Sequence, residues 1–226
     1  MLTDALLNVN VNGDSVQSLE ILFLTTVLML LPSLIIMMTS FTRYVVVFSF
    51  LRSAMGTQQT PPNMVLVGMA LILTLFTMSP TLAAINEEAF VPYQEEEITQ
   101  MEFFERAQVP LKRFMASWTE LDNVGLYCTM SGLDAPETKE EVTQLPLTVV
   151  IPAFVTSELK RAFIIGFLLY IPFVLIDMIV ASTLMSMGMV MLPPSMISTP
   201  FKLLLFILLD GWQLLFSTLV AGFTIG

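Results

Sequence analysis

The 226-residue sequence contains no histidine and a single cysteine. The absence of histidine excludes imidazole general bases, Ser-His-Asp triads and zinc sites with histidine ligands. The lone Cys128 can form no disulfide within the chain and no thiolate cluster for a metal. The phosphate-binding motif G-x-x-x-x-G-K-[S/T] is also missing. We therefore expect no catalytic site, no metal site and no cofactor.

Charge is equally scarce. Charged residues make up 12% of the chain, hydrophobic residues make up 55%, and the formal net charge is −10. The mean hydropathy of +0.81 lies far above that of an ordinary soluble domain. Nine basic residues in an acidic chain also argue against a nucleic-acid partner. This composition indicates a membrane protein.

Four apolar segments have the length of membrane-grade helices: 21–38, 65–85, 162–192 and 203–226. Three of them contain proline, at Pro32, Pro80 and Pro172. Proline removes a backbone donor and clashes with the preceding turn, so these helices should be kinked or broken. We predict an all-α integral membrane protein whose apolar helices form hairpins.

Two carboxylates, Asp177 and Asp210, lie deep within the third and fourth apolar segments. An unpaired charge there costs at least about 2.5 kcal/mol, so each should face protein or water. Each is expected to accept bonds from a neighbouring helix or subunit, or else to be protonated or bonded to serine or backbone groups. The candidate donors are Arg43, Arg52, Lys160, Arg161 and Lys202.

The charges are segregated along the chain. Residues 86–150 hold 13 acidic and four basic residues, so they account for −9 of the net charge of −10. We expect a polar segment at 1–20, a first apolar helical pair at 21–85, an acidic helical domain at 86–150 and a second apolar pair with a Met-rich loop at 151–226. Basic residues favour the cytoplasmic side of a membrane. Arg43 and Arg52 in an expected loop at 39–63, and Lys202 in a short connection, therefore place the acidic domain and both termini on the opposite, outer side.

The acidic domain has a helical pattern. We expect Glu95, Glu96 and Glu97 to begin one helix and Pro110 to begin another. A loop is expected over 130–137. One apolar stripe follows a helical period, and it consists of Leu111, Phe114, Met115, Trp118 and Leu121. A domain of roughly 65 residues buries little core alone, so the stripe should pack against the apolar helices or a neighbouring copy, and less favourably within a self-contained hairpin.

Methionines are concentrated near the end of the third apolar segment, at Met185, Met187, Met189, Met191 and Met196. Thioethers can bind Cu(I), although no histidine or cysteine is near to assist. They can also serve as flexible apolar filler in a hydrophobic helix. On an α-helix, steps of two residues rotate by about 200°, so alternate methionines would point in nearly opposite directions. Gly188, Pro193 and Pro194 instead favour a loop that presents deformable thioethers in one place.

Three stretches resemble the FliP family of flagellar export-gate proteins. They are LLPSLIIMMTSFTRYVVVFSFLRSAMGTQQTPPN at 30–63, PAFVTSELKRAFIIGFLLYIPFVLIDMIVASTLMSMGMVMLPPSMISTPFK at 152–202 and LLDGWQL at 208–214. The family generally carries a cleavable signal sequence, whereas residues 1–20 lack a basic stretch and an apolar core. Either such a signal is missing from this sequence or the first apolar segment itself directs insertion.

The resemblance implies a subunit of a protein-export pore that is not an enzyme. It implies a ring of five copies with FliQ and FliR in the bacterial inner membrane at the flagellar basal body, and energy supplied through FlhA and FlhB. Unfolded flagellar proteins would pass through the centre. The residues matching the family's methionine gasket are Met187, Met189 and Met191, with Met185 adjacent.

Charged residues of the matched stretches are candidates for subunit contacts, namely Arg43, Glu158, Lys160, Arg161 and Lys202. A different class of function remains open, a small-solute or ion transporter that relays through Asp177 and Asp210. A transporter built from inverted repeats should show two corresponding halves. The sequence instead places an acidic domain in its middle and shows no internal repeat.

Overall fold

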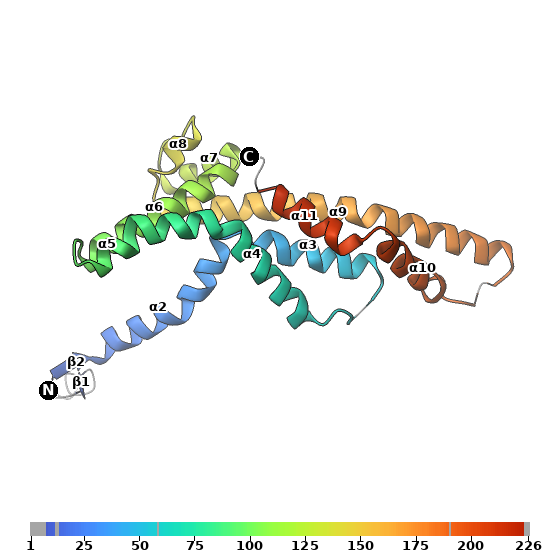
Figure 1. Ribbon diagram of the computed structural model, residues 1–226, viewed down its shortest axis with the longest axis horizontal. Helices are drawn as coiled ribbons and strands as arrows, with labels where there is room; N and C mark the ends of the chain where they lie inside the picture. Colours follow the sequence, from blue (N-terminus) through green and yellow to red (C-terminus); the bar gives the residue numbers. More distant parts are fainter. Residues whose placement is uncertain (1–7, 12–13, 58, 190, 224–226) are drawn as a thin grey trace. The chain divides into compact units, whose positions relative to one another are not determined.

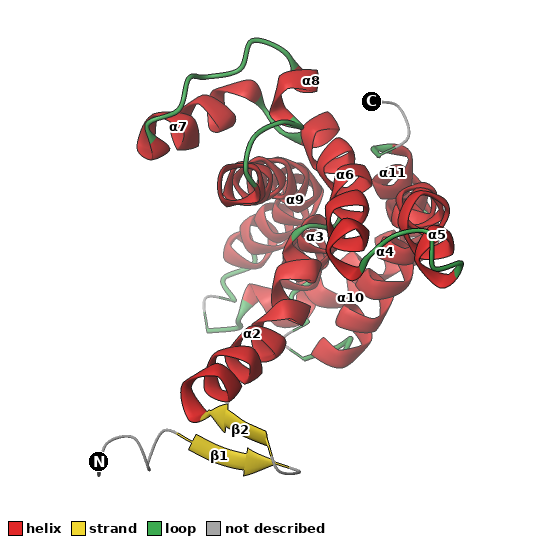
Figure 2. Ribbon diagram, turned by 90° about the vertical axis from the view of Figure 1, so that its left-hand side faces the viewer, coloured by secondary structure: helices red, strands yellow, loops and turns green. Residues whose placement is uncertain are grey.

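The computed structural model describes residues 8–11, 14–57, 59–189 and 191–223. The chain forms two compact units, Met1–Met37 and Met38–Gly226. In the first unit, strands β1 (Asn8–Val11) and β2 (Asp14–Gln17) pair antiparallel, with Val9 opposite Val16. Helix α2 (Ser18–Met37) follows and covers most of the first apolar segment. The two strands, yellow in Figure 2, are an exception to the predicted all-α fold.

The second unit is helical throughout its described residues, as predicted, and Figure 1 shows the order of its elements. They are α3 (Phe41–Ala54), α4 (Asn63–Ile85), the π-helical segment η1 (Asn86–Phe90), α5 (Val91–Gln94), α6 (Gln100–Trp118), α7 (Leu121–Ser131), α8 (Lys139–Val142), α9 (Leu147–Ser186), α10 (Pro194–Leu208) and α11 (Gly211–Ala221).

Helix α3 occupies most of the stretch 39–63, so the prediction of a loop there is wrong. A search for long apolar runs passes over this helix because arginine, serine and threonine interrupt it. Its buried face nevertheless follows a helical period, at Tyr44, Val47, Phe48 and Leu51. These side chains pack with parts of α4, α9 and α11 in one hydrophobic core. Figure 2, in which α9 is viewed nearly end-on, shows α3 beside it.

The helical form of α3 also weakens the argument for membrane orientation. Arg43 lies in α3 and is buried, and Lys202 lies in α10 and is buried as well. Neither residue lies in a loop, so neither is a loop charge of the kind that orients a membrane protein. Of the three basic residues on which the prediction relied, Arg52 alone remains partly exposed.

Proline does not break the longest helix. Helix α9 continues over 40 residues through Pro152 and Pro172, because a proline removes a single hydrogen bond from a helix that is stabilised on both sides. The break occurs instead in the fourth apolar segment, where α10 and α11 are bent by 62°. Within the described residues, two helical stretches are long and apolar enough to cross a membrane, Asn63–Gln94 and Leu147–Ser186, or three if the bent pair forms one span.

The acidic region starts differently from the prediction. Glu95, Glu96 and Glu97 form a turn, in which Glu96 has a φ of 58°, and they do not begin a helix. Helix α6 begins after Thr99, whose hydroxyl accepts a bond from the Glu102 backbone while the Glu102 carboxylate accepts the Thr99 N–H at 2.8 Å. That bond to the carboxylate holds the pKa of Glu102 below its usual value. Pro110 lies inside α6, not at its start.

The apolar stripe of α6 packs against the N-terminal half of α9, which confirms the predicted contact with the apolar helices. Met115 is fully buried with Val150 and Phe154 of α9, and Trp118 packs at the edge of this second core. Gly132 ends α7 in the left-handed conformation at the start of the predicted loop. The acidic region therefore shares its core with α9 and is not a separate hairpin.

Candidate functional site

Four of the five methionines lie at the end of α9 and in the loop that follows, as the glycine and prolines predict, and Met196 lies in the first turn of α10. The Gly188 N–H bonds to the Met185 carbonyl at 3.1 Å, and the Met189 N–H bonds to the Leu184 carbonyl at 3.0 Å. With Gly188 at a φ of 76°, this pair of bonds closes the helix in a Schellman arrangement. Pro194 then begins α10. Val190, which follows Met189, lies outside the described residues.

All five methionine side chains are exposed in the single chain, with exposed fractions of 62% for Met185, 63% for Met187, 43% for Met189, 96% for Met191 and 68% for Met196. Met187, Met189 and Met191 lie beyond the end of α9 and are not filler within that helix, whereas Met185 lies in its last turn. Exposed apolar side chains gathered at one place mark a contact surface. Thioethers suit such a surface because they repack at little cost.

An ion pair anchors the two helices that carry this loop. Lys202 of α10 donates to the Asp177 carboxylate of α9 at 2.6 Å, and the Ser198 hydroxyl donates to the same carboxylate at 2.6 Å. Lys202 also donates to the Ala54 carbonyl at the end of α3 at 3.1 Å. The lysine is buried, so its charge needs these acceptors. Asp177 thus has the bonds from a neighbouring helix that its sequence position requires.

Asp210 is arranged differently. It precedes α11 with a φ of 48°, it is exposed, and its side chain does not cap the helix. Among the described residues, no hydrogen bond or ion pair to its carboxylate is found. The bend beside it depends on Gly211, because a Cβ there would lie 2.3 Å from the Phe206 ring. The expectation of a bonded partner for Asp210 is therefore not met within one chain.

A second charged cluster joins the apolar helices to the acidic region. Arg43 of α3 makes two bonds to the Glu158 carboxylate of α9, Nε to Oε2 at 2.8 Å and Nη2 to Oε1 at 2.6 Å. Both side chains are buried. Arg161 lies 3.5 Å from the same carboxylate and donates to the Trp118 carbonyl at 2.6 Å. The Arg43 guanidinium also faces the Phe223 ring, 3.5 Å from its centroid.

The candidate contact residues therefore make bonds within the chain. Arg43, Glu158 and Arg161 come together in one cluster, and Lys202 pairs with Asp177. Lys160 pairs with Glu120 of the acidic region at 2.6 Å, in an exposed position. The sequence gives one signal for these bonds, since a lone acid such as Glu158 within an apolar stretch requires a cation nearby.

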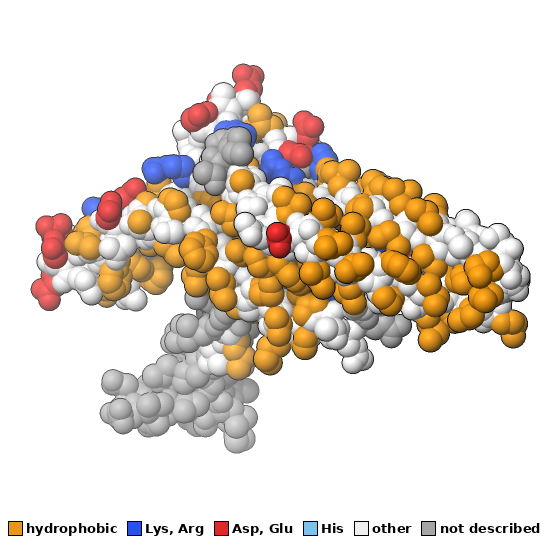
Figure 3. Space-filling view, turned by 45° about the vertical axis from the view of Figure 1, so that its right-hand side comes forward, with side chains coloured by type: hydrophobic (Ala, Val, Ile, Leu, Met, Phe, Trp, Pro, Cys, Tyr) orange, Lys and Arg blue, Asp and Glu red, His pale blue; other side chains and the backbone are white. Residues whose placement is uncertain are grey.

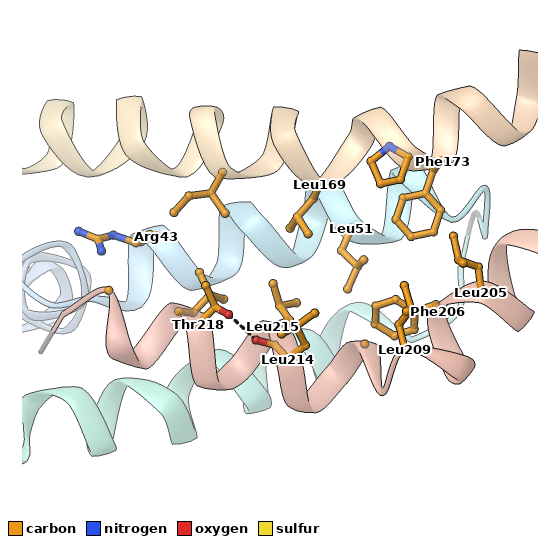
Figure 4. A pocket seen from close by; sticks show the side chains of 15 residues that line it. Arg43, Leu51, Leu169, Phe173, Leu205, Phe206, Leu209, Leu214, Leu215 and Thr218 are labelled. Atoms are coloured by element: carbon orange, nitrogen blue, oxygen red, sulfur yellow. Dashed lines mark hydrogen bonds between the residues drawn. The ribbon is translucent and has the colours of Figure 1, made fainter. Parts of the chain in front are cut away.

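An apolar groove of about 400 Å³ runs between α3, α9, α10 and α11. Figure 4 shows Arg43 at one end of it and Phe173 toward the other, with leucine side chains such as Leu51, Leu169 and Leu215 directed into the space between. The groove contains little polar surface apart from Arg43 and Thr218, whose hydroxyl bonds to the Leu214 carbonyl. It therefore provides a place for apolar groups and no reaction centre.

These features define a helical protein with apolar helices of membrane-spanning length, one buried and one partly buried ion pair that fasten them, and an exposed methionine loop. Residues 24–219 match the model of the FliP family. The chain is 48% identical to flagellar biosynthetic protein FliP of Bacillus subtilis, over 92% of each chain. It is also 48% identical to the protein of that name from Aquifex aeolicus, over 93% of this chain and 88% of the relative. The identity to the protein of that name from Caulobacter vibrioides is 48% as well, over 96% of this chain and 83% of the relative. The chain belongs to the FliP family, flagellar biosynthetic proteins of the export apparatus.

Proposed function

We propose that this protein is a subunit of the pore through which unfolded flagellar proteins cross the bacterial inner membrane at the flagellar basal body. Five copies form a ring with FliQ and FliR, and the acidic region, residues 86–150, faces the periplasm. FlhA and FlhB couple the pore to its energy source. The loops of the copies meet at the centre, where Met185, Met187, Met189 and Met191 form a deformable seal.

The observation that carries this proposal is the exposure of the methionines on a loop whose two supporting helices are fastened together. Side chains exposed in one copy can pack against those of other copies, and dispersion contacts between them exclude water and ions. A passing chain would displace these flexible side chains without making specific bonds to them. The ion pair between Asp177 and Lys202 supports the same interpretation, because it joins α9 to α10 close to the loop that connects them.

Replacement of Met187, Met189 and Met191 together by alanine tests the seal. The truncation removes the atoms that would meet at the centre and leaves the supporting helices unchanged. We expect normal assembly of the complex and a membrane that leaks small ions or solutes. The matched control replaces the same residues by leucine, which keeps most of the volume and should leak much less. The measurements are cell growth in the presence of permeant ions and cellular uptake of a dye. Both are made in cells in which assembly of the complex has been verified.

If cells that contain the assembled alanine variant leak ions no faster than cells with the unchanged protein, the methionines are not the seal. The alternative of an ion transporter predicts instead that conduction depends on Asp177 and Asp210 as proton or ion relays. The Asp177 carboxylate is bound by Lys202 and Ser198, so a relay through both carboxylates would have to break these bonds. The transporter is therefore the weaker candidate.

A further inference from the structure

The charges of the apolar helices in the second unit nearly all have partners of opposite sign. In the described parts of α3, α4, α9, α10 and α11 and their connections, Glu158 has Arg43 and Arg161, Asp177 has Lys202, and Lys160 has Glu120. Two charges are left over, Arg52 as a cation and Asp210 as an anion. Surplus charges of opposite sign, one of each per chain, call for a common explanation.

Asp210 lies in the midst of exposed apolar side chains. Its neighbours Ile207, Leu208, Leu209 and Leu214 have exposed fractions of 69%, 72%, 58% and 59%. Figure 3 shows how little charge interrupts the hydrophobic surface over these helices. Any apolar partner that covers this surface would remove water from the carboxylate, and the loss is costly unless the partner also brings a cation. The surface therefore selects a partner that is apolar and carries one positive charge.

Arg52 provides such a charge. It is partly exposed at the C-terminal end of α3, and among the described residues its side chain has one polar contact, with the Asn63 Oδ1 atom at 3.5 Å, the outer limit of a hydrogen bond. Exposed apolar side chains flank it as well, since Met64 and Val65 at the start of α4 have exposed fractions of 85% and 47%. A guanidinium is suited to bind a carboxylate with two parallel bonds, and this contact with Asn63 leaves that capacity unused.

We propose that Arg52 of one copy binds Asp210 of the neighbouring copy, so that this contact is part of the surface between subunits. The inference rests on the proposed assembly into a ring. In a head-to-tail ring, each copy gives its cation to one neighbour and receives a cation from the other, so no surplus charge is left when the ring closes. The apolar surfaces around both residues are covered by the same contact.

Charge reversal with two tagged copies tests this pairing. Arg52→Asp alone and Asp210→Arg alone each place like charges opposite one another, and we expect the yield of assembled complex to fall about tenfold or more. When both variants are produced together, alternating copies present opposite charges at up to four of the five contacts of the ring, and one contact between like charges remains. The expected result is that yield recovers at least severalfold and that both tags are found in one complex. Arg106→Asp and Asp134→Arg, exposed charge reversals in the acidic region, are the matched controls and should leave the yield unchanged.

Rescue in trans separates this pairing from a bond within one chain, because an internal bond would stay broken in both variants. A second measurement does not depend on assembly of reversed variants. Arg52→Cys in one tagged copy and Asp210→Cys in the other should be joined by a short bismaleimide. Ser217→Cys, about 10 Å farther along α11, should be joined far less.

The outcomes are distinct. If the unchanged protein gives no homo-oligomer by native mass measurement, the proposed ring itself fails. If the ring forms, but the reversed variants assemble as well as the controls and the bismaleimide does not join the Arg52→Cys copy to the Asp210→Cys copy, the pairing is wrong while the proposed function stands.

Discussion

The buried bonds between Arg43 and Glu158 should be the most sensitive point of the fold. Glu158→Gln preserves the shape of the side chain and removes its charge, so Arg43 stays buried with no acid beside it. Loss of one partner from a buried ion pair costs about 3–5 kcal/mol. Contacts of the guanidinium with Phe223 and Trp118 hold it in place, so it cannot escape to water. The loss of about 3–5 kcal/mol is a large fraction of a total free energy of unfolding of about 5–15 kcal/mol.

Denaturant unfolding in detergent, followed by the fluorescence of Trp118 beside the cluster, gives the measurement. Glu120→Gln is the matched control, because it removes the exposed pair with Lys160 and should cost only about 0–1 kcal/mol. Replacing both Arg43 and Glu158 by methionine should restore much of the loss, because the one cation left without its acid, Arg161, is partly exposed and keeps its bond to the Trp118 carbonyl. If Glu158→Gln is no more harmful than Glu120→Gln, the buried pair does not hold these helices together and the reasoning is refuted.

Two glycine substitutions and one labelling experiment test the packing. Gly166→Ala places a Cβ about 2.5 Å from the Phe50 ring and should cost about 1–3 kcal/mol in the same unfolding assay, whereas Gly68→Ala, in open space within α4, should be neutral or stabilising. Gly188→Ala meets no atom but forces a side chain into a φ of 76°, so we expect a loss of about 1–2 kcal/mol and faster proteolysis at the methionine loop. The Cys128 thiol is buried, and burial raises its pKa. Maleimide should therefore label this thiol only as the protein unfolds. Rapid labelling of the native protein would contradict the packing of α7 on α9.

Features fixed by neighbours in the chain could be predicted from the sequence. The methionine loop follows from Gly188, which ends one helix, and from Pro193 and Pro194, which suit the start of the next, and the structure has the loop. The stripe of α6 follows from a period of 3.6 residues, and it is buried as expected. The β-hairpin was missed, although valines alternate with polar residues on both sides of an Asn-Gly pair, a pattern typical of a tight hairpin.

Features that depend on distant contacts could not be predicted. Arg43 and Glu158 are separated by 115 residues, and no local pattern says which of several cations an isolated acid will meet. Asp177 and Lys202 are closer in sequence, yet their pairing depends on the return of α10 along α9. The break at Asp210 carries a weak signal, because a glycine follows it, but the flanking leucines favour a continuous helix. Burial against a second element overrides local preference in each case.

If the methionine loop forms the proposed seal, the ion pair between Asp177 and Lys202 limits how far that seal can yield. Residues 187–193 separate the end of α9 from the start of α10, and a stretch of that length extends to at most about 25 Å. Slack of this kind lets side chains swing aside for an unfolded chain or a single helix, which is about 10–12 Å across. A folded domain is wider and would require α9 and α10 to separate, at the expense of the bonds to Lys202. Under the proposed function, the same contact that supports the loop also sets an upper limit on the width of its cargo.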